Sequence, residues 1–154
     1  MQDTLPIHFA PLQGYTEAIY RNAHDAFFGG VDTYYTPFVR LEKGNFRRRD
    51  VRGIEPENNG VTHLIPQLIA SSAEKAEVIL SLFIEKGYQE VDINLGCPFP
   101  LLAKRHNGSG ILPYPEEVKA LLSIVTRYPQ ISFSVKMRLG WEQPDECLAL
   151  APIL

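Results

Sequence analysis

The residues most able to do chemistry lie in one stretch of this chain, EVDINLGCPFPLLAKRHNGSG, at positions 90–110. The stretch opens as a buried strand, residues 91–95, and then presents Cys97 between a glycine and a proline. Asp92 and Asn94 are polar within that apolar strand, and burying polar groups costs free energy unless they are hydrogen-bonded. A thiol with the usual pKa of about 8.5 is mostly protonated at neutral pH. Cys97 could therefore act as a general acid, or as a nucleophile if its pKa is lowered; the alternative is a small buried side chain without a chemical role.

Two other predicted strands also end in polar side chains. Lys136 and Arg138 alternate along residues 131–139, so they share one face, which we expect to be the interior of the fold. That face could place a cation against the electron-rich edge of a flavin or against a phosphate, or it could be a solvated strand end. Gln67, in residues 62–69, carries an amide that can donate and accept at once. It suits the edge of a heterocycle, or it could be satisfied by the backbone.

Two basic clusters lie outside these strands, at residues 47–49 and at Lys104 and Arg105. Together they suit the phosphates of a polynucleotide, although each alone reads as a solvated charge run. We interpret the Gly-Ser-Gly run at 108–110 as a mobile loop beside Cys97, because it lacks the pattern of a phosphate-binding loop. The histidines lack the spacing of metal ligands, so no metal site is predicted.

Short apolar segments alternate with amphipathic ones along the chain, which predicts parallel βαβ units. Thr16 is the expected N-cap of the first helix, and a further helix is expected from about residue 144. Residues 40–60 are polar and are predicted to hold at most one short helix. The predicted strands are residues 5–10, 32–39, 62–69, 91–95 and 131–139, and the predicted helices are residues 16–28, 72–86 and 115–128.

The polar side chains gather at the carboxyl ends of the predicted strands. That edge builds the active site of a (β/α)8 barrel. A doubly wound sheet would instead need a glycine-rich fingerprint after its first strand, and residues 11–17, PLQGYTE, are not one. We therefore expect an α/β fold that is the N-terminal portion, about five βα units, of a TIM (β/α)8 barrel. A full barrel takes about 250 residues, so residues 1–154 would form a partial domain of a longer protein; a half-barrel paired with its own copy is the less favoured alternative.

Composition sets broader limits. The chain has 154 residues, 45% hydrophobic, with a net charge of −3 and two cysteines. These values are ordinary for a single globular domain, and two cysteines are too few for a disulfide framework. No apolar run is long enough for a membrane span, and the N-terminus does not resemble a signal peptide, so a cytoplasmic protein is expected. Unpaired strand edges in an incomplete barrel would favour self-association.

Four motifs, in this order, resemble those of the tRNA-dihydrouridine synthases: APLQGYTE, IPQLIA, VDINLGCPFP followed by KRHNGSGILP, and SVKMRLGW. The resemblance covers essentially the whole chain. It implies an FMN-dependent (β/α)8 barrel with an added C-terminal helical domain, which uses NADPH to reduce a uridine in tRNA. By this resemblance the remaining barrel strands and the helical domain lie outside the 154 residues.

The resemblance also assigns cofactor contacts. Pro11, Leu12 and Gln13 match the first flavin-contacting segment, Gln67 matches the glutamine that contacts the isoalloxazine, and Lys136 matches the lysine beside it. The family usually carries Met-(Ala/Glu)-Gly where this chain has Leu-Gln-Gly. Because TIM barrels usually bind phosphate after strands seven and eight, we expect the 154-residue chain alone to bind FMN weakly or not at all.

On the substrate side, Asn94 resembles the residue that contacts the target base. Cys97 resembles the cysteine that protonates C5 of the uracil while the reduced flavin supplies a hydride to C6. Arg138, Lys104 and Arg105 would then contact the tRNA, whose target base must leave its stack.

Two alternatives stay open at this point. Dihydroorotate dehydrogenase is also a flavin barrel that acts on a dihydropyrimidine, and it carries an Asn-Leu-x-Cys-Pro segment. The basic clusters favour tRNA over a small acid. The second alternative is a non-catalytic RNA-binding barrel that has lost its flavin.

Overall fold

The computed structural model describes residues 5–154. Six strands form two three-stranded parallel sheets, with orders β1-β2-β5 and β6-β7-β8, and a short antiparallel hairpin pairs β3 with β4. The strands are β1 (His8–Phe9), β2 (Thr33–Tyr35), β3 (Leu41–Glu42), β4 (Asn45–Phe46), β5 (Leu64–Ile65), β6 (Gln67–Leu68), β7 (Glu90–Leu95) and β8 (Ser132–Met137). The described part of the chain is therefore an α/β protein with parallel sheets, as the sequence predicts.

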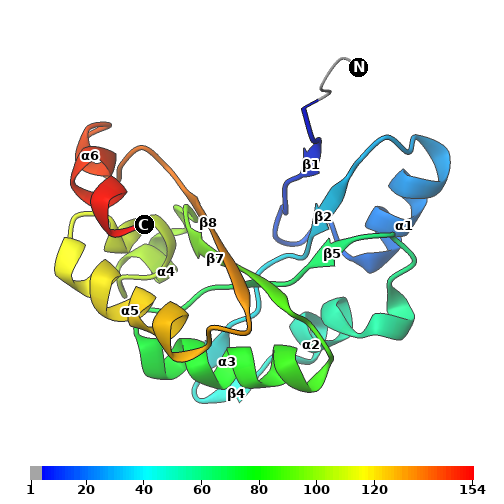
Figure 1. Cartoon of the computed structure of the whole chain (residues 1–154), viewed down its shortest axis with the longest axis horizontal. Coiled ribbons are helices and arrows are strands. Elements are labelled where there is room, and N and C mark those ends of the chain that lie inside the picture. Colours follow the sequence, from blue (N-terminus) through cyan, green and yellow to red (C-terminus); the bar gives the residue numbers. More distant parts are fainter. Residues whose placement is uncertain (1–4) are drawn as a thin grey trace.

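One segment joins the two sheets. β5 and β6 are separated only by Pro66, which has no backbone N–H to donate to a strand ladder. The ladder continues on both sides of it: before Pro66 the N–H of Thr36 donates to the carbonyl of Ile65 over 3.1 Å, and after it the N–H of Val39 donates to the carbonyl of Gln67 over 2.8 Å. Five chain segments thus run parallel and side by side in chain order, forming a curved layer (Figure 1).

The helices account for the rest of the architecture. Helices α3 and α5 contact each other and cover one face of β7 and β8 (Figure 1). The helical elements are α1 (Ala18–Phe27), α2 (Arg48–Ile54), η1 (Pro56–Asn58), α3 (Ala73–Glu85), α4 (Pro100–Ala103), η2 (Gly108–Ile111), α5 (Pro115–Arg127), α6 (Glu146–Leu150) and η3 (Ala151–Ile153).

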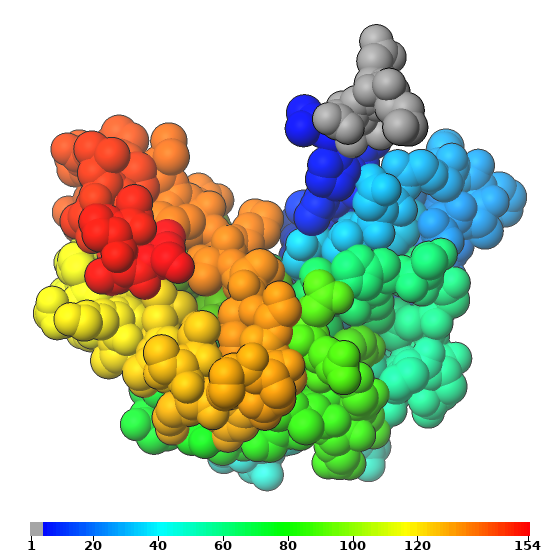
Figure 2. Space-filling view, viewed as in Figure 1, coloured from blue at the N-terminus to red at the C-terminus, as the bar shows by residue number. Residues whose placement is uncertain are grey.

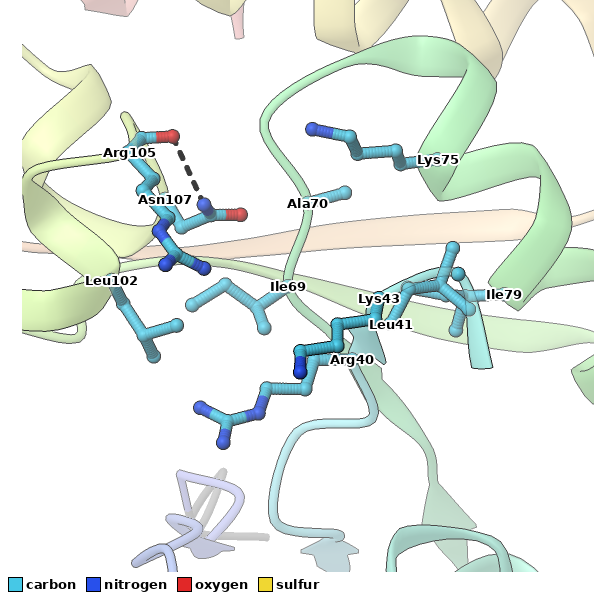
Figure 3. Close-up of a pocket in the computed structure, with 11 residues that line it drawn as sticks. Arg40, Leu41, Lys43, Ile69, Ala70, Lys75, Ile79, Leu102, Arg105 and Asn107 are labelled. Carbon is cyan, nitrogen blue, oxygen red and sulfur yellow. Dashed lines mark hydrogen bonds between the residues drawn. The ribbon is translucent and has the colours of Figure 1, made fainter. Parts of the chain in front are cut away.

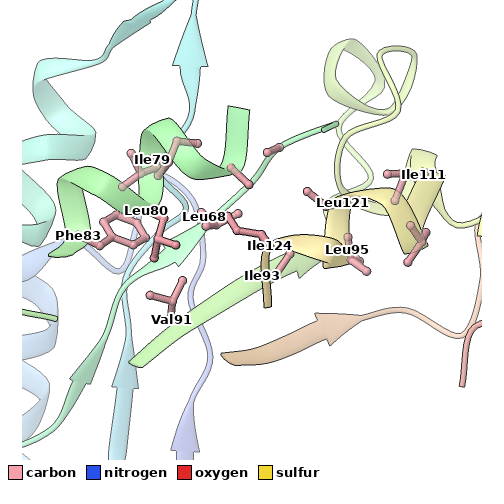
Figure 4. Packing of buried hydrophobic residues seen from close by; sticks show 14 of the residues in the cluster. Leu68, Ile79, Leu80, Phe83, Val91, Ile93, Leu95, Ile111, Leu121 and Ile124 are labelled. Carbon is pink, nitrogen blue, oxygen red and sulfur yellow. The ribbon is translucent and has the colours of Figure 1, made fainter. Parts of the chain in front are cut away.

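The hydrophobic core lies between the β6–β7–β8 sheet and these helices (Figure 4). Because side chains alternate along a strand, every second residue of β7 enters the core, and Asp92 and Asn94 point to the opposite face. β8 alternates in the same way: its odd-numbered residues pack on the core, and Ser132, Ser134 and Lys136 lie on the other, open face. The strand residues of the core are Leu68, Val91, Ile93 and Leu95, and the helical ones include Ile79, Leu80, Phe83, Leu121 and Ile124.

Three local predictions are wrong. Thr16 does not cap α1, which begins after Glu17; its hydroxyl instead accepts a hydrogen bond from the N–H of Leu12 over 2.8 Å, which fixes the preceding turn. Residues 40–60 hold more than one short helix, because the β3–β4 hairpin, α2 and η1 all form there. Residues 108–110 are not a mobile loop: they form the buried turn η2.

Close backbone contact explains the burial of η2. A Cβ built on Gly110 would lie 2.2 Å from the carbonyl oxygen and 2.5 Å from the Cα of Ala103, so no side chain fits between η2 and α4. Gly108 has a φ of +60°, and a Cβ there would lie 2.5 Å from the carbonyl oxygen of Cys97. The glycines therefore let the chain fold back against the turn that carries the cysteine.

We expect Gly110→Ala to lower the free energy of unfolding by about 1–3 kcal/mol, because an added methyl group must displace the backbone of Ala103. Urea unfolding of the 154-residue chain measures this. Gly60→Ala is the matched control, since a Cβ there meets only ordinary contacts, at 3.8 Å from Asn22. Equal stability of the two variants would contradict the close packing of η2 on α4.

Candidate active site

A directional chain of hydrogen bonds connects three neighbouring strands at the open face of the sheet. The Asn94 side chain donates from Nδ2 to Gln67 Oε1 over 2.7 Å, and Gln67 Nε2 donates to Asp92 Oδ2 over 2.6 Å. Ser134 Oγ donates to Asp92 Oδ1 over 2.7 Å. At the other end, Asn94 Oδ1 accepts from the backbone N–H of Cys97 over 2.9 Å and from that of the preceding residue over 3.0 Å. We call these side chains, Gln67, Asp92, Asn94 and Ser134, the polar network.

Strand register brings the polar network together. In the parallel ladders Gln67 lies opposite Asp92, and Asp92 lies opposite Ser134. Asn94 lies opposite Lys136 in the same way. All of these residues point away from the helix-covered face, because alternation places their neighbours in the core. The network is thus a property of the pairing of three strands rather than of any one of them.

Asp92 sets the direction of every hydrogen bond in the network. Burial raises the pKa of its carboxyl above the usual range, while the hydrogen bonds from Gln67 and Ser134 and the charge of Lys136 lower it in part. Both carboxyl oxygens of Asp92 accept, Oδ2 from Gln67 and Oδ1 from Ser134, so Gln67 turns its NH₂ group toward Asp92 and its oxygen toward Asn94. Asn94 is oriented in turn, with its oxygen toward the backbone of Cys97.

Cys97 is held on both sides of its peptide unit. Its N–H donates to Asn94, and its carbonyl accepts from the N–H of Ser109 over 3.0 Å and from the hydroxyl of Ser109 over 2.9 Å. The residue is half-buried, and its thiol forms no disulfide. This arrangement fixes the backbone from which the thiol projects, which is what a general acid requires.

A cavity of 270 Å³ lies beside the polar network, in the hollow between β1 and β8 (Figure 2). It brings the predicted residues Pro11 and Lys136 together. Lys136 is exposed there, and Gln67 lies beneath the open face with only 1% of its surface exposed. The residues that line the cavity are His8, Ala10, Pro11, Tyr35, Asp92, Ser134, Val135 and Lys136.

The segment after β1 has mixed exposure. Leu12 is 58% exposed and makes no part of the cavity wall. The Oε1 atom of Gln13 is buried and has no hydrogen-bond partner among the described residues. A buried acceptor without a donor costs free energy in the folded state. A bound ligand with an N–H or O–H group would supply the missing donor.

The predicted basic residues do not converge on this cavity. Arg138 is exposed directly after β8, and its Nε donates to the carbonyl of Gly96 over 2.8 Å. Lys104 and Arg105 are exposed in the segment between α4 and η2. Arg105 lines a different cavity.

The arginine run at 47–49 is partly neutralised by carboxylates. Arg49 makes hydrogen bonds of 2.9 and 2.8 Å from Nε and Nη2 to Glu17 Oε1, and Arg47 lies 4.0 Å from Asp50. This cluster is therefore partly committed to internal ion pairs, which reduces the charge that it can offer to a polynucleotide.

Sequence reasoning assigned no site role to four residues that the structure places there: His8, Tyr35, Asp92 and Ser134. His8 Nδ1 and the Tyr35 hydroxyl lie 2.9 Å apart at the wall of the cavity. Asp92 carried a usable signal, an acidic residue within an apolar strand. Nothing local marks Tyr35 as a site residue, because its position depends on how β2 pairs with β1 and β5.

Within residues 5–154, no group of three His, Cys, Asp or Glu side chains is arranged to hold a metal ion. None of the helices in this range is long and apolar enough to cross a membrane.

Because burial raises the pKa of Asp92, the folded state binds a proton that the unfolded state has already released. The resulting stability is fully present below the usual carboxyl pKa of about 3.9 and is lost as the pH rises through the raised value. The measured quantity is the difference in unfolding free energy between the wild type and Asp92→Asn. We expect this difference to become smaller or more negative as the pH rises from about 4 to about 7. Urea unfolding at several pH values tests this, with the exposed Asp145→Asn correcting for the loss of one negative charge. A flat difference would contradict a raised pKa at Asp92.

Comparison with known proteins identifies the family. Residues 8–154 match the family model described as dihydrouridine synthase. The chain is 28% identical over 142 residues, 88% of its length, to a probable tRNA-dihydrouridine synthase 1 from Synechocystis sp., of which it covers 38%. It is 28% identical over 155 residues to a tRNA-dihydrouridine(16) synthase from Haemophilus ducreyi, covering 94% of this chain and 47% of the relative. With tRNA-dihydrouridine synthase B from Pasteurella multocida the identity is 24% over 148 residues, covering 96% of this chain and 44% of the relative.

The chain spans less than half the length of each of these relatives. The family match nevertheless extends over nearly all of its residues, including the polar network, Cys97 and both cavities. The chain belongs to the dihydrouridine synthase family.

Proposed function

We propose that the whole protein is a flavin-dependent tRNA-dihydrouridine synthase that uses NADPH to reduce the C5–C6 bond of a uridine in tRNA. The observation that carries this proposal is the held peptide unit of Cys97, placed by the polar network at the carboxyl edge of parallel strands. The family match and the printed names of the relatives support the same activity. A dihydroorotate dehydrogenase or a non-catalytic RNA-binding barrel gains no support from them.

For the architecture, we propose that residues 1–154 form the N-terminal part, about five βα units, of a TIM barrel. The support is the set of five parallel segments in chain order, with helices on one face and the polar side chains on the other. The remaining strands and a C-terminal helical domain would belong to the rest of the whole protein. Self-association through open strand edges and a cytoplasmic location stay predictions.

The residues beside the 270 Å³ cavity fit FMN. The pyrimidine edge of a flavin carries both donors and acceptors, and Lys136 offers an exposed cation at the cavity wall. Gln13 follows the lining residue Pro11 by two positions, and its buried oxygen has no partner among the described residues. Pro11 and Leu12 would contact the ring system. Gln67 has one Nε2 hydrogen not used in the network, which could reach the ring edge from below. When bound and reduced, the flavin supplies the hydride.

On the substrate side, the proposed catalytic residue is Cys97, whose Sγ–H gives its proton to C5 of the uracil. Asn94 keeps one Nδ2 hydrogen free for the base and uses its oxygen to hold the backbone of Cys97. Arg138, Lys104 and Arg105 would contact the tRNA around the extruded base. The chain would thus supply the acid and the orientation for the reduction.

In the whole protein, we expect Cys97→Ala to lower dihydrouridine formation by about 10²–10⁴-fold, the range for losing a general acid. Reduction of the flavin by NADPH should stay close to wild type, because the thiol takes no part in that step. Mass spectrometry of tRNA nucleosides measures the first, and loss of the visible flavin absorbance measures the second. Cys147→Ala is the matched control, and unchanged product from Cys97→Ala would refute the assignment.

The 154-residue chain by itself is expected to purify with little or no flavin, because the phosphate site of a TIM barrel usually follows strands seven and eight. The visible absorbance of the purified chain, compared with its protein absorbance, gives the flavin content. One flavin per chain would show that these residues hold the cofactor without the rest of a barrel.

A further inference from the structure

A second cavity, of 320 Å³, is lined by four cationic side chains and by no carboxylate. We call it the basic cavity, and its cations are Arg40, Lys43, Lys75 and Arg105. Figure 3 shows these side chains around one opening, extending from separate parts of the chain. Of these four residues, only Arg105 is assigned a role, a contact with tRNA, by the resemblance to the tRNA-dihydrouridine synthases.

Three separate parts of the chain bring these cations together: the β3–β4 hairpin, α3 and the segment after α4. Arg40 directly precedes β3, and Lys43 lies in the β3–β4 turn. Lys75 is in the first turn of α3, and Arg105 follows α4. Such a gathering is costly for the fold, because like charges in one cavity repel each other and long side chains lose freedom. A bound anion would offset that cost.

Internal partners neutralise only part of this charge. Arg40 lies 3.5 Å from Glu42, whose side chain is 59% exposed, and its charge also acts on the buried carboxyl of Asp50, whose pKa it lowers in part. The buried Nε of Arg40 has no hydrogen-bond partner among the described residues. Lys75 donates to the neutral hydroxyl of Ser71 over 2.9 Å. No ion pair is found for Lys43 or Arg105 within the described range. The basic cavity thus keeps more positive than negative charge in a chain whose net charge is −3.

We propose that the basic cavity binds the phosphodiester backbone of the RNA substrate, an inference that rests on the proposed function. Two guanidinium groups and two ammonium groups exceed what one phosphate monoester needs, and they suit successive phosphates. Ile69 and Leu102 form an apolar part of the cavity wall. This part could contact the ribose that lies between two successive phosphates. Because this chain has no net positive charge, any RNA affinity of its residues must come from a local patch of this kind.

Position also favours RNA over a free phosphate. Arg105 belongs to the segment between α4 and η2, and η2 folds back to hold the carbonyl of Cys97. Ile69 and Arg40 follow the carboxyl ends of two strand segments, so the basic cavity opens at the same edge as the polar network. An RNA strand anchored there would continue toward the turn that carries Cys97.

The test compares two lysines on helices, Lys75 in α3 and Lys119 in α5, both of which are exposed. In the whole protein, tRNA affinity is measured by fluorescence anisotropy over a range of salt concentrations. Removing one phosphate contact should reduce the slope of log affinity against log salt by about 1, which weakens binding about tenfold near 0.1 M salt. We expect this for Lys75→Gln and for Lys43→Gln, and no change for Lys119→Gln.

The outcomes separate the RNA assignment from its alternatives. Slopes and affinities of Lys43→Gln and Lys75→Gln equal to those of Lys119→Gln overturn it. If the Lys43→Gln and Lys75→Gln variants bind tRNA like Lys119→Gln but bind inorganic phosphate more weakly in calorimetry, the cavity is a site for free phosphate and the RNA assignment is overturned. Dihydrouridine formation by the wild type is followed in parallel. If the wild type forms none while the two variants lose tRNA affinity as expected, the proposed function fails and the RNA site stands.

Discussion

The buried carboxylate of Asp92 is the constraint on which the rest of the site depends. It accepts from Gln67 and from Ser134, and it has no proton of its own to offer when ionised. Each amide further along must therefore turn its NH₂ group toward Asp92 and its oxygen away. The consequence reaches the backbone N–H of Cys97, which donates to the last oxygen in the chain. A group without reactivity of its own thus orients the residue proposed to carry the chemistry.

This constraint holds only because three strands keep one register. A shift of β7 by one residue would turn Asp92 and Asn94 into the hydrophobic core and bring apolar side chains to the open face. The core opposes such a shift, since Val91, Ile93 and Leu95 are buried against α3 and α5. The apolar side of the strand therefore stabilises the geometry of its polar side. The backbone contacts of η2 complete the arrangement by holding the carbonyl of Cys97.

Two cavities at the same sheet edge divide the proposed tasks. The smaller one, lined by Pro11, Tyr35 and Lys136, suits a heterocyclic cofactor. The basic cavity suits the backbone of a nucleic acid, and it is built from the β3–β4 hairpin, α3 and the segment after α4. The turn with Cys97 is connected to both: through Asn94 to the polar network, and through η2 to the segment with Arg105. Such a division would bring a base to the cofactor while the phosphates are held at a distance from it.

Much of this could be predicted from the sequence alone, because the relevant signals are local. Glycine and proline punctuation and the two hydrophobic periods predicted the order of strands and helices, the polar face of the strand with Lys136, and the turn that carries Cys97. The rest depended on contacts between residues distant in the chain. Only the tertiary structure showed that Asp92 orients Gln67, that Tyr35 lines the smaller cavity, and that the glycines at 108–110 are buried. It also showed that Arg105 lines the cavity that contains Lys75 rather than the one that contains Lys136. Periodicity determines which face a side chain takes, whereas strand register and helix packing decide which side chains meet there.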